Sequence, residues 1–286
     1  MFNISQNHYF LFLTTVGVLG LLIGSFLNVV IYRLPIMLQR EWEQDCSEYL
    51  KQSAPIKYKI ITLITPRSHC PKCGVQISWW QNIPVVSYIL LHGKCGFCQN
   101  VIHWRYPIVE LISCLATLLV AISFGVSIQT IALLFLTWAL IAAIFIDFDH
   151  QLLPDNITLP LIWAGLLLNT KHIFTTPQNA IIGAASGYLF LWLVAYLFKL
   201  IRKIDGMGHG DFKLLAVFGA WLGWQVLPII LFVASFIGSV VGITLILSKK
   251  GRFTKPIPFG PYLAFAGWLA FFWGQNALNW YLSMLY

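Results

Sequence analysis

The stretch YFLFLTTVGVLGLLIGSFLNVVIY, residues 9–32, contains no charged side chain. A helix needs about 20 consecutive apolar residues to cross the hydrocarbon core of a bilayer. This stretch is therefore long enough to span a membrane. No positively charged segment precedes it, which argues against a cleavable signal peptide, so we expect it to remain as a membrane anchor.

The composition of the whole chain extends this prediction. Of the 286 residues, 58% are hydrophobic and 10% are charged, and the mean hydropathy is +0.77. Soluble domains carry about 25% charged residues, so we expect an all-α polytopic membrane protein with about eight transmembrane helices. The two shortest spans are plausible if they are tilted less than the others or end in a protein-lined cavity that water reaches. The predicted spans are 9–32, 106–125, 128–148, 156–170, 178–201, 212–225, 226–248 and 261–285.

The formal net charge of +8 would also suit a nucleic-acid-binding protein. The positions of the charges argue against that class, because basic residues gather at those span ends that an alternating topology places on one side. Such ends face the cytoplasm. We therefore expect no nucleic-acid partner, and both termini on the outer side. Of the 18 Lys and Arg residues, all but Lys171 lie in 33–105, 199–203, 213 and 249–255.

One polar block, residues 33–105, interrupts the apolar sequence. We expect three parts: a first transmembrane helix over 1–32, a small cytoplasmic insert over 33–105, and a membrane core over 106–286. Within the insert, QREWEQDCSEYLKQ, residues 39–52, predicts a short surface helix. In the first span, the small-residue stripe 17–24 predicts close packing against another helix, and Asn28 needs a polar partner there.

The insert contains the pattern CxxC-x21-CxxC. Two CxxC turns aim four sulfurs at one point, which suits the tetrahedral coordination of Zn(II), and Gly74 and Gly96 are expected to relieve the turns. Cytoplasmic thiols stay reduced, so disulfides are not expected, although a redox dithiol pair is an alternative. Four ligands leave no open position, so the metal would be structural. The predicted ligands are Cys70, Cys73, Cys95 and Cys98; Cys46 and Cys114 receive no role.

Six of the ten acidic residues lie near predicted spans, where an ionised side chain is costly and therefore a candidate for function. In IDFDHQLLPD, residues 146–155, Asp147 closes an apolar run, Asp149 suits a solvated or supporting group as well as a catalyst, and Asp155 is placed to cap the next helix. The six acids are Glu110, Asp147, Asp149, Asp155, Asp205 and Asp211.

Asp211 stands in GMGHGDFKLLA, residues 206–216. A helix N-cap would explain this acid but not the glycines at 206, 208 and 210, which would let a substrate chain approach closely. The intervening spans leave the cytoplasmic face and return to it, which brings Asp147 and Asp211 to one face. Two neighbouring carboxylates that share a proton suggest an aspartyl protease, whereas a proton-coupled transporter would use the same acids.

Motifs along nearly the whole chain resemble those of the type IV prepilin peptidases, which are leader peptidases and N-methyltransferases of pilus and type II secretion systems. The segment GHGD, residues 208–211, also fits the GxGD motif of intramembrane aspartyl proteases. The matching motifs, in the order of the family, are GSFLNVVIYRLP, SHCPKCG, CGFC, YPIVELI, IDFDHQLLPD, LPLIWAGLLLN, GHGDFKLLA and PFGPYLA.

The resemblance implies that Asp147 and Asp211 are the catalytic pair, with Gly208, Gly210, Asp149 and Lys213 as supporting candidates. His209 departs from the family, in which Tyr is more usual, and receives no role. The implied substrates are prepilins or pseudopilins, cut after a Gly at the cytoplasmic face of the bacterial inner membrane.

The resemblance further implies methylation of the new N-terminal residue, usually Phe, by S-adenosylmethionine. No Gly-rich loop that would cradle the adenosine follows a strand, so no residue is assigned to this methyl donor. The alternative is a peptidase without methyltransferase activity, in which the zinc insert acts as a docking module.

Overall fold

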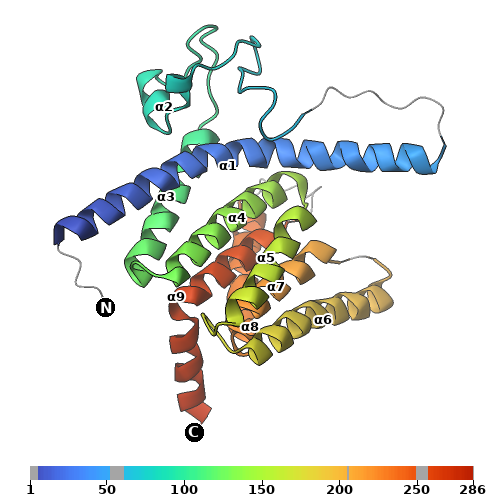
Figure 1. Ribbon diagram of the computed structural model, residues 1–286. Coiled ribbons are helices and arrows are strands. Elements are labelled where there is room, and N and C mark those ends of the chain that lie inside the picture. The colour runs from blue at the N-terminus through green and yellow to red at the C-terminus, as the bar shows by residue number, and fades with distance from the viewer. Residues whose placement is uncertain (1–5, 52–60, 205, 249–256, 286) are drawn as a thin grey trace. The chain divides into compact units, whose positions relative to one another are not determined.

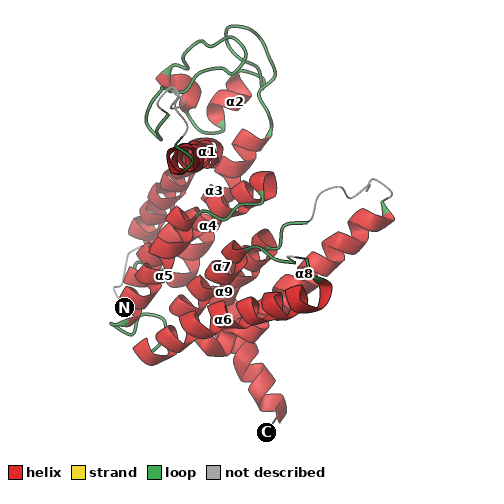
Figure 2. Ribbon diagram, turned by 90° about the vertical axis from the view of Figure 1, so that its right-hand side faces the viewer, coloured by secondary structure: helices red, strands yellow, loops and turns green. Residues whose placement is uncertain are grey.

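The computed structural model describes residues 6–51, 61–204, 206–248 and 257–285, and helices dominate this part of the chain (Figures 1 and 2). The side chains of 6, 7, 275–282, 284 and 285 are not described. Asp205 and the basic segment 249–255 lie outside the described residues. The helices are α1 (Gln6–Tyr49), η1 (Trp79–Asn82), α2 (Val86–Leu90), α3 (Arg105–Phe124), α4 (Ile128–His150), α5 (Asp155–Asn169), α6 (Pro177–Arg202), α7 (His209–Leu222), η2 (Trp224–Val226), α8 (Leu227–Leu247) and α9 (Gly260–Leu285).

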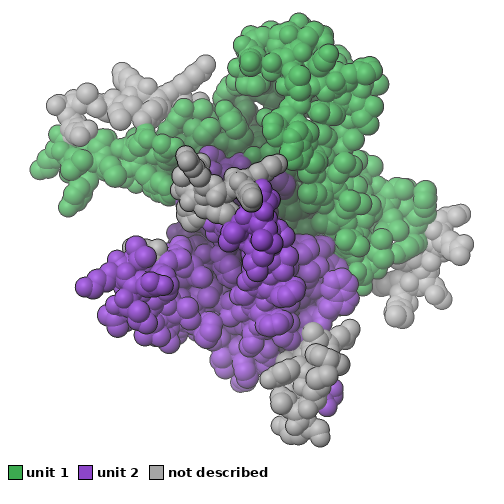
Figure 3. Space-filling model, turned by 180° about the vertical axis from the view of Figure 1, so that it is seen from behind, with its two compact units in different colours: residues 1–142 green, residues 143–286 purple. Residues whose placement is uncertain are grey.

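The chain forms two compact units, residues 1–142 and 143–286, which Figure 3 shows in different colours. The boundary falls within α4, so the last turns of that helix belong to the second unit. The cysteine insert lies in the first unit, whereas Asp147 and Asp211 lie in the second.

In the first unit, α1 packs against α3 through the predicted glycine stripe. A methyl group on Gly20 would lie 3.0 Å from Thr117, and one on Gly24 would lie 2.7 Å from the Cα of Glu110. The side-chain amide of Asn28 donates to the carbonyl of Tyr106 in α3 at 3.1 Å. Both the packing role of the stripe and the need of Asn28 for a partner on another helix are therefore confirmed.

The prediction of a separate surface helix over 39–52 is wrong, because α1 continues without a break to Tyr49. The helix contains Pro35, which removes one backbone hydrogen bond at a typical cost of about 3 kcal/mol. The residues that follow are mostly good helix formers, and Gln39 donates to Glu43 one turn later at 3.1 Å. These preferences keep the helix intact beyond the proline.

The second unit is organised around α7. Between Asp211 and Leu222 every residue of this helix is buried except Lys213. A helix that is apolar on all sides belongs in a protein core, and α5, α6, α8 and α9 all contact α7. The approach to α6 is close, since a methyl group on Gly183 or Gly219 would collide with the backbone at the other position.

All eight predicted spans coincide with helices. By length and composition, five helices of the described residues are suited to crossing a membrane, namely His8–Tyr49, Arg105–Phe124, Ile128–His150, Pro177–Arg202 and Trp224–Leu247. The shortest predicted spans correspond to α5 and α7, which have 15 and 14 residues. These lengths fall below the roughly 20 residues of a full crossing, so the count of eight spans stays a prediction.

Candidate active site and cysteine cluster

Asp147 lies in the last turn of α4, where its side chain is only 5% exposed. Asp149 is exposed, because two residues along a helix turn the side chain roughly to the opposite face. The structure therefore distinguishes these two neighbouring acids by burial, and Asp147 is the one that points into the protein.

Asp211 lies in the first turn of α7, and its side chain is 8% exposed. The N-cap of this helix is Gly208, whose carbonyl accepts the backbone N–H of Asp211 at 3.2 Å. The prediction of an N-cap role for Asp211 is therefore wrong, because the helix begins earlier than expected, at His209. A carboxylate in the first turn still interacts favourably with the positive end of the helix dipole.

The two carboxylates converge beside Gly260, the first residue of α9. The backbone N–H of Gly260 donates a hydrogen bond to the Asp147 carboxylate. A methyl group at Gly260 would collide with Oδ2 of Asp147 and would lie 3.2 Å from Oδ1 of Asp211. Both oxygens thus reach a single point, and Asp211 interacts directly with the charge of Asp147.

Gly260 and Leu153 are site residues that the sequence reasoning missed. The side chain of Leu153 is buried and would lie 3.0 Å from a methyl group at Gly260. It also occupies the space beside Gly210, where a methyl group would lie 2.6 Å from its Cβ. The motif PFGPYLA contains Gly260, but a glycine beside prolines indicates an ordinary turn, so nothing in the sequence alone points to its contact with the carboxylates.

The three alternate glycines before Asp211 have different surroundings. A methyl group at Gly206 would meet Phe198 at 2.6 Å, and the space beside Gly210 is filled by Leu153. Nothing lies within 4 Å of the corresponding point at Gly208. Gly206 and Gly210 therefore make room for side chains of the protein itself. Of the three glycines, only Gly208 has beside it the open space that a substrate would need.

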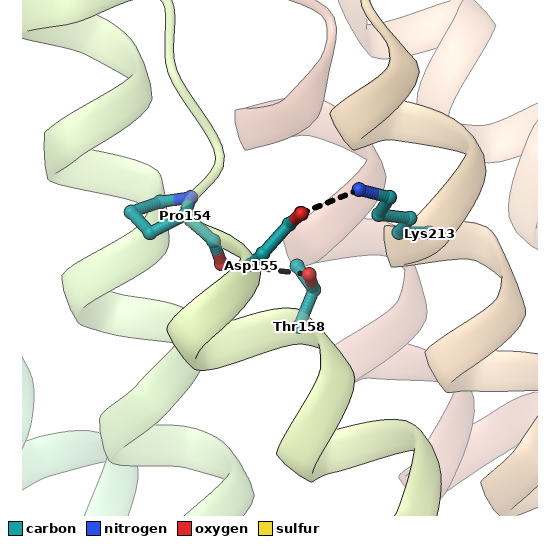
Figure 4. A network of polar contacts seen from close by, with 4 residues as sticks. All are labelled: Pro154, Asp155, Thr158 and Lys213. Carbon is teal, nitrogen blue, oxygen red and sulfur yellow. Dashed lines mark hydrogen bonds and ion pairs between the residues drawn. The ribbon is translucent and has the colours of Figure 1, made fainter. Parts of the chain in front are cut away.

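Lys213 forms an ion pair with Asp155 at the start of α5 (Figure 4). Its Nζ donates to Oδ1 and Oδ2 of Asp155 at 2.6 and 2.7 Å. Asp155 does not cap α5 as predicted, since the N-cap is Pro154 and Asp155 is the first helical residue. The ion pair joins the first turn of α5 to the second turn of α7. His209 is exposed and contacts the ring of Phe212 edge-on at 5.3 Å.

The four predicted cysteine ligands come together in the insert. Their sulfur atoms all lie within 4.8 Å of one another, and the sulfurs of Cys70 and Cys98 are 3.8 Å apart. With Zn–S bonds of about 2.3 Å, a tetrahedral site has sulfur–sulfur distances of about 3.8 Å, so the arrangement fits a zinc ion. Backbone N–H groups of Cys73 and Lys72 lower the pKa of the Cys70 thiol to about 6, whereas burial and the neighbouring thiols raise the pKa of Cys98 to about 11.

Each CxxC pair forms a short hairpin turn. The N–H groups of Gly74 and Gln99 donate to the carbonyls of Cys70 and Cys95 at 2.9 and 3.0 Å. Gly74 has a positive φ of +71°, as its predicted role in the turn requires. In the second turn the left-handed residue is Gln99, with φ of 55°, so the same prediction for Gly96 is wrong. Gly96 instead provides room for the side chain of Gln81, which a methyl group would approach to 2.8 Å.

The remaining cysteines lie apart from this cluster. Cys46 is exposed on α1. Cys114 lies on the side of α3 that packs against α1, and its thiol donates to the carbonyl of Gly17 at 3.4 Å. This contact makes Cys114 a small residue in the packing between α1 and α3.

Comparison with known proteins identifies relatives along almost the whole chain. The family model described as "Bacterial Peptidase A24 N-terminal domain" matches residues 18–124, and that of the "Type IV leader peptidase family" matches 134–243. Three relatives are named "Prepilin leader peptidase/N-methyltransferase". That of Aeromonas salmonicida is 49% identical, over 96% of this chain and 95% of its own. That of Stutzerimonas stutzeri is 50% identical, over 93% of this chain and 92% of its own. That of Pseudomonas aeruginosa is 47% identical, over 97% of this chain and 96% of its own. No solved structure matches the chain. The identities and coverage of these relatives show that the chain belongs to the type IV leader peptidase family.

Proposed function

We propose that this protein removes the leader peptide from prepilins or pseudopilins and then methylates the new N-terminal amine. The observation that carries the proposal is the convergence of two buried carboxylates, Asp147 and Asp211, beside Gly260 in a chain of the type IV leader peptidase family. The names of the relatives support both activities.

Asp147 and Asp211 are the proposed catalytic pair. Two like charges at close range in a buried site share a proton, because full ionisation of both is costly. The ionised carboxylate takes a proton from a water molecule, whose oxygen attacks the scissile carbonyl carbon. The protonated carboxylate donates its proton to the carbonyl oxygen, which gives a tetrahedral intermediate. As this intermediate collapses, the other carboxylate passes the proton it took from water to the leaving nitrogen, the C–N bond breaks, and the hydroxyl that becomes the new carbonyl returns its proton to the carboxylate that donated it. The hydrogen bond from Gly260 orients Asp147 for this role.

Supporting roles are proposed for four nearby residues. Gly208 leaves open space through which a substrate backbone approaches Asp211. Gly210 lets Leu153 pack beside the carboxylates. Lys213 holds the start of α5 against α7 through its ion pair, and the exposed Asp149 attracts the basic leader of the substrate.

The proposed location is the bacterial inner membrane, with eight spans and the catalytic face in the cytoplasm. The proposed parts are a first transmembrane helix over 1–32, an insert over 33–105 and a protease core over 106–286. The substrate leader is basic and precedes an apolar helix. That helix rests in the bilayer while the bond after a glycine reaches the carboxylates at the cytoplasmic face.

The insert is proposed to hold a structural zinc ion through Cys70, Cys73, Cys95 and Cys98. The geometry of the four sulfurs fits this ion, and a fully coordinated zinc stabilises a small domain that lacks a large core. The second activity is proposed to use S-adenosylmethionine, which supplies a methyl group to the free amine and leaves as its thioether.

Purified protein in detergent, supplied with a prepilin and labelled S-adenosylmethionine, tests the proposal. Mass spectrometry is expected to find cleavage after the glycine and one labelled methyl group on the new N-terminus. Cleavage without label transfer would instead establish a peptidase without methyltransferase activity. If the prepilin stayed intact both in detergent and after membrane lipids were added, the proposed function would be wrong.

A further inference from the structure

The cysteine insert exposes an apolar surface that neither proposed activity uses. We call it the insert face and define it by six side chains of η1, α2 and the loop between them. The exposed fractions are 81% for Trp79 and 65% for both Ile89 and Leu90. A contiguous apolar surface of this kind marks a site of contact with a partner or a membrane. The residues of the insert face are Trp79, Trp80, Ile83, Val86, Ile89 and Leu90.

The insert face spans two elements that contact each other. In α2, Val86, Ile89 and Leu90 follow the spacing i, i+3, i+4, so they lie on one side of the helix. The η1 helix contacts α2 and contributes the two tryptophans. This combination of tryptophan rings and aliphatic side chains is typical of segments that lie at the membrane–water interface.

The start of α2 is attached to a predicted membrane span. The backbone N–H of Val85 donates to Oε2 of the buried Glu110 at 2.7 Å. Glu110 lies in the second turn of α3, about 7–8 Å along the helix from Arg105 at a rise of 1.5 Å per residue. Figures 1 and 2 show α2 beside the first turns of α3. The insert face is therefore held next to the end of a helix that is long and apolar enough to cross a membrane.

The charge of the insert indicates the chemistry of its partner. No Asp or Glu occurs between Glu48 and Glu110. A segment that is exclusively basic and carries exposed aromatic residues attracts anionic lipid head groups. It would repel the basic leader of a prepilin. The basic residues of this segment are Lys51, Lys57, Lys59, Arg67, Lys72, Lys94 and Arg105.

Two more exposed aromatic residues lie at the start of α3, the candidate span to which α2 is attached. Trp104 and Tyr106, at the start of α3, are 62% and 46% exposed. Tryptophan and tyrosine at the end of a span mark the level of the lipid head groups. Because Glu110 ties α2 to this end of α3, the insert face lies beside the end of the candidate span that carries these two aromatic residues.

We propose that the insert face is an interfacial anchor that rests in the head-group region of an anionic bilayer. The apolar side chains enter the boundary of the acyl chains, and exposed basic side chains of the insert, such as Arg67, Lys72 and Lys94, contact the lipid phosphates. The zinc site is then held against the membrane surface, and the head groups neutralise the basic charge that would otherwise oppose the approach of a basic leader.

Site-specific photocrosslinking of the full-length protein tests this proposal. The protein is reconstituted in nanodiscs of phosphatidylglycerol and phosphatidylcholine, with p-benzoylphenylalanine in place of Ile89. The matched control carries the crosslinker in place of Ser87, which lies roughly on the opposite side of α2. Mass spectrometry is expected to find phospholipid adducts at position 89 and none at position 87. Nanodiscs of phosphatidylcholine alone are expected to reduce the adduct at position 89.

The other outcomes contradict the proposal. Equal lipid labelling at positions 87 and 89, or labelling of a second copy of the chain, would show that the insert face is not an interfacial anchor. Adduct formation that is unchanged without phosphatidylglycerol would overturn the role of anionic lipid. Circular dichroism checks that each variant folds. If the variant at Ile89 does not fold, the crosslinker is placed at Leu90 instead, so the experiment still gives an answer.

Discussion

The aspartate site and the cysteine cluster are built in opposite ways. Each half of the cysteine cluster is a local hairpin, closed by hydrogen bonds between residues four apart, and three of its four thiols are at least partly exposed. The aspartate site joins the end of α4, the start of α7 and the start of α9, and both of its carboxylates are buried. One site thus depends on local turns and a metal, and the other on the packing of distant helices.

This difference determines what should happen when either site is changed. The cluster lies in residues 1–142 and the aspartates lie in 143–286. Substitutions that share no partners usually have independent effects. Changes at the aspartates should therefore leave metal binding intact, and changes at the cysteines should affect leader removal less. The predictions below test this separation in order of their expected effect on cleavage.

Replacement of either catalytic aspartate should have the largest effect. Asp147→Asn and Asp211→Asn keep the shape of the side chain but remove its ability to exchange a proton. We expect leader removal to fall by about 10³-fold or more, as for the loss of a general acid–base group. Single-turnover cleavage of a prepilin in detergent measures the effect.

The same variants should still methylate a pre-cleaved pilin and should retain the metal content of the unaltered protein. Asp149→Asn is the comparison, because Asp149 is on the same helix but exposed, and loss of its proposed attraction for the leader should reduce cleavage far less. Cleavage at the normal rate by Asp147→Asn or Asp211→Asn would disprove the assignment of the pair.

A methyl group at Gly260 should have the second largest effect. Gly260→Ala would force the carboxylates of Asp147 and Asp211 apart, and a displacement of about 1 Å in a catalytic group costs on the order of 10²-fold in rate. We expect a comparable fall in kcat for leader removal. The control is Gly242→Ala in α8, where the new methyl group would meet only Ile257, at an ordinary 3.8 Å. Equal activity of the two variants would show that the carboxylates do not depend on Gly260.

Loss of a cysteine ligand should affect the metal strongly and leader removal weakly. We expect Cys70→Ser to lose the bound zinc, because four thiolates are needed to fill a tetrahedral site. Leader removal should decrease by less than about tenfold, since the substitution lies in the other unit. Elemental analysis and the cleavage assay measure the two effects, with Cys46→Ser as the control outside the cluster. A loss of cleavage as large as that of Asp147→Asn would contradict the separation.

The same contrast explains which features the sequence predicted. The cysteine site was visible from spacing alone, because each CxxC turn closes within a few residues. The eight helical segments were also visible, since apolar length and glycine spacing are local properties. The alternation of spans brought Asp147 and Asp211 to one face, but the choice of Asp147 over Asp149 required the family resemblance, because the sequence does not determine which of these two side chains is buried. Gly260 escaped notice because only the folded chain brings α9 to the carboxylates.

Helix ends were less predictable than helix positions. Asp155 and Asp211 were both expected to cap helices, and both lie inside the first turn instead. Pro154 and Gly208 adopt extended backbone conformations and take the N-cap positions. An acidic side chain is favourable at either place, so residue type alone does not fix the boundary. In the structure, Asp155 has instead become the partner of Lys213.

The ion pair between Lys213 and Asp155 should give the smallest effect, although it lies close in sequence to Asp211. The side chain of Asp155 is 52% exposed and that of Lys213 is 24% exposed, so water solvates either charge when its partner is removed. A double-mutant cycle of Lys213→Met and Asp155→Asn should give a coupling energy of about 0.5–1 kcal/mol in thermal unfolding. Leader removal should change by no more than about fivefold, which corresponds to roughly 1 kcal/mol. Lys171→Met is the control for loss of a positive charge elsewhere. A fall of about 10³-fold for Lys213→Met would place this residue with the catalytic pair, because a half-exposed ion pair that only positions α5 against α7 cannot account for a loss of that size.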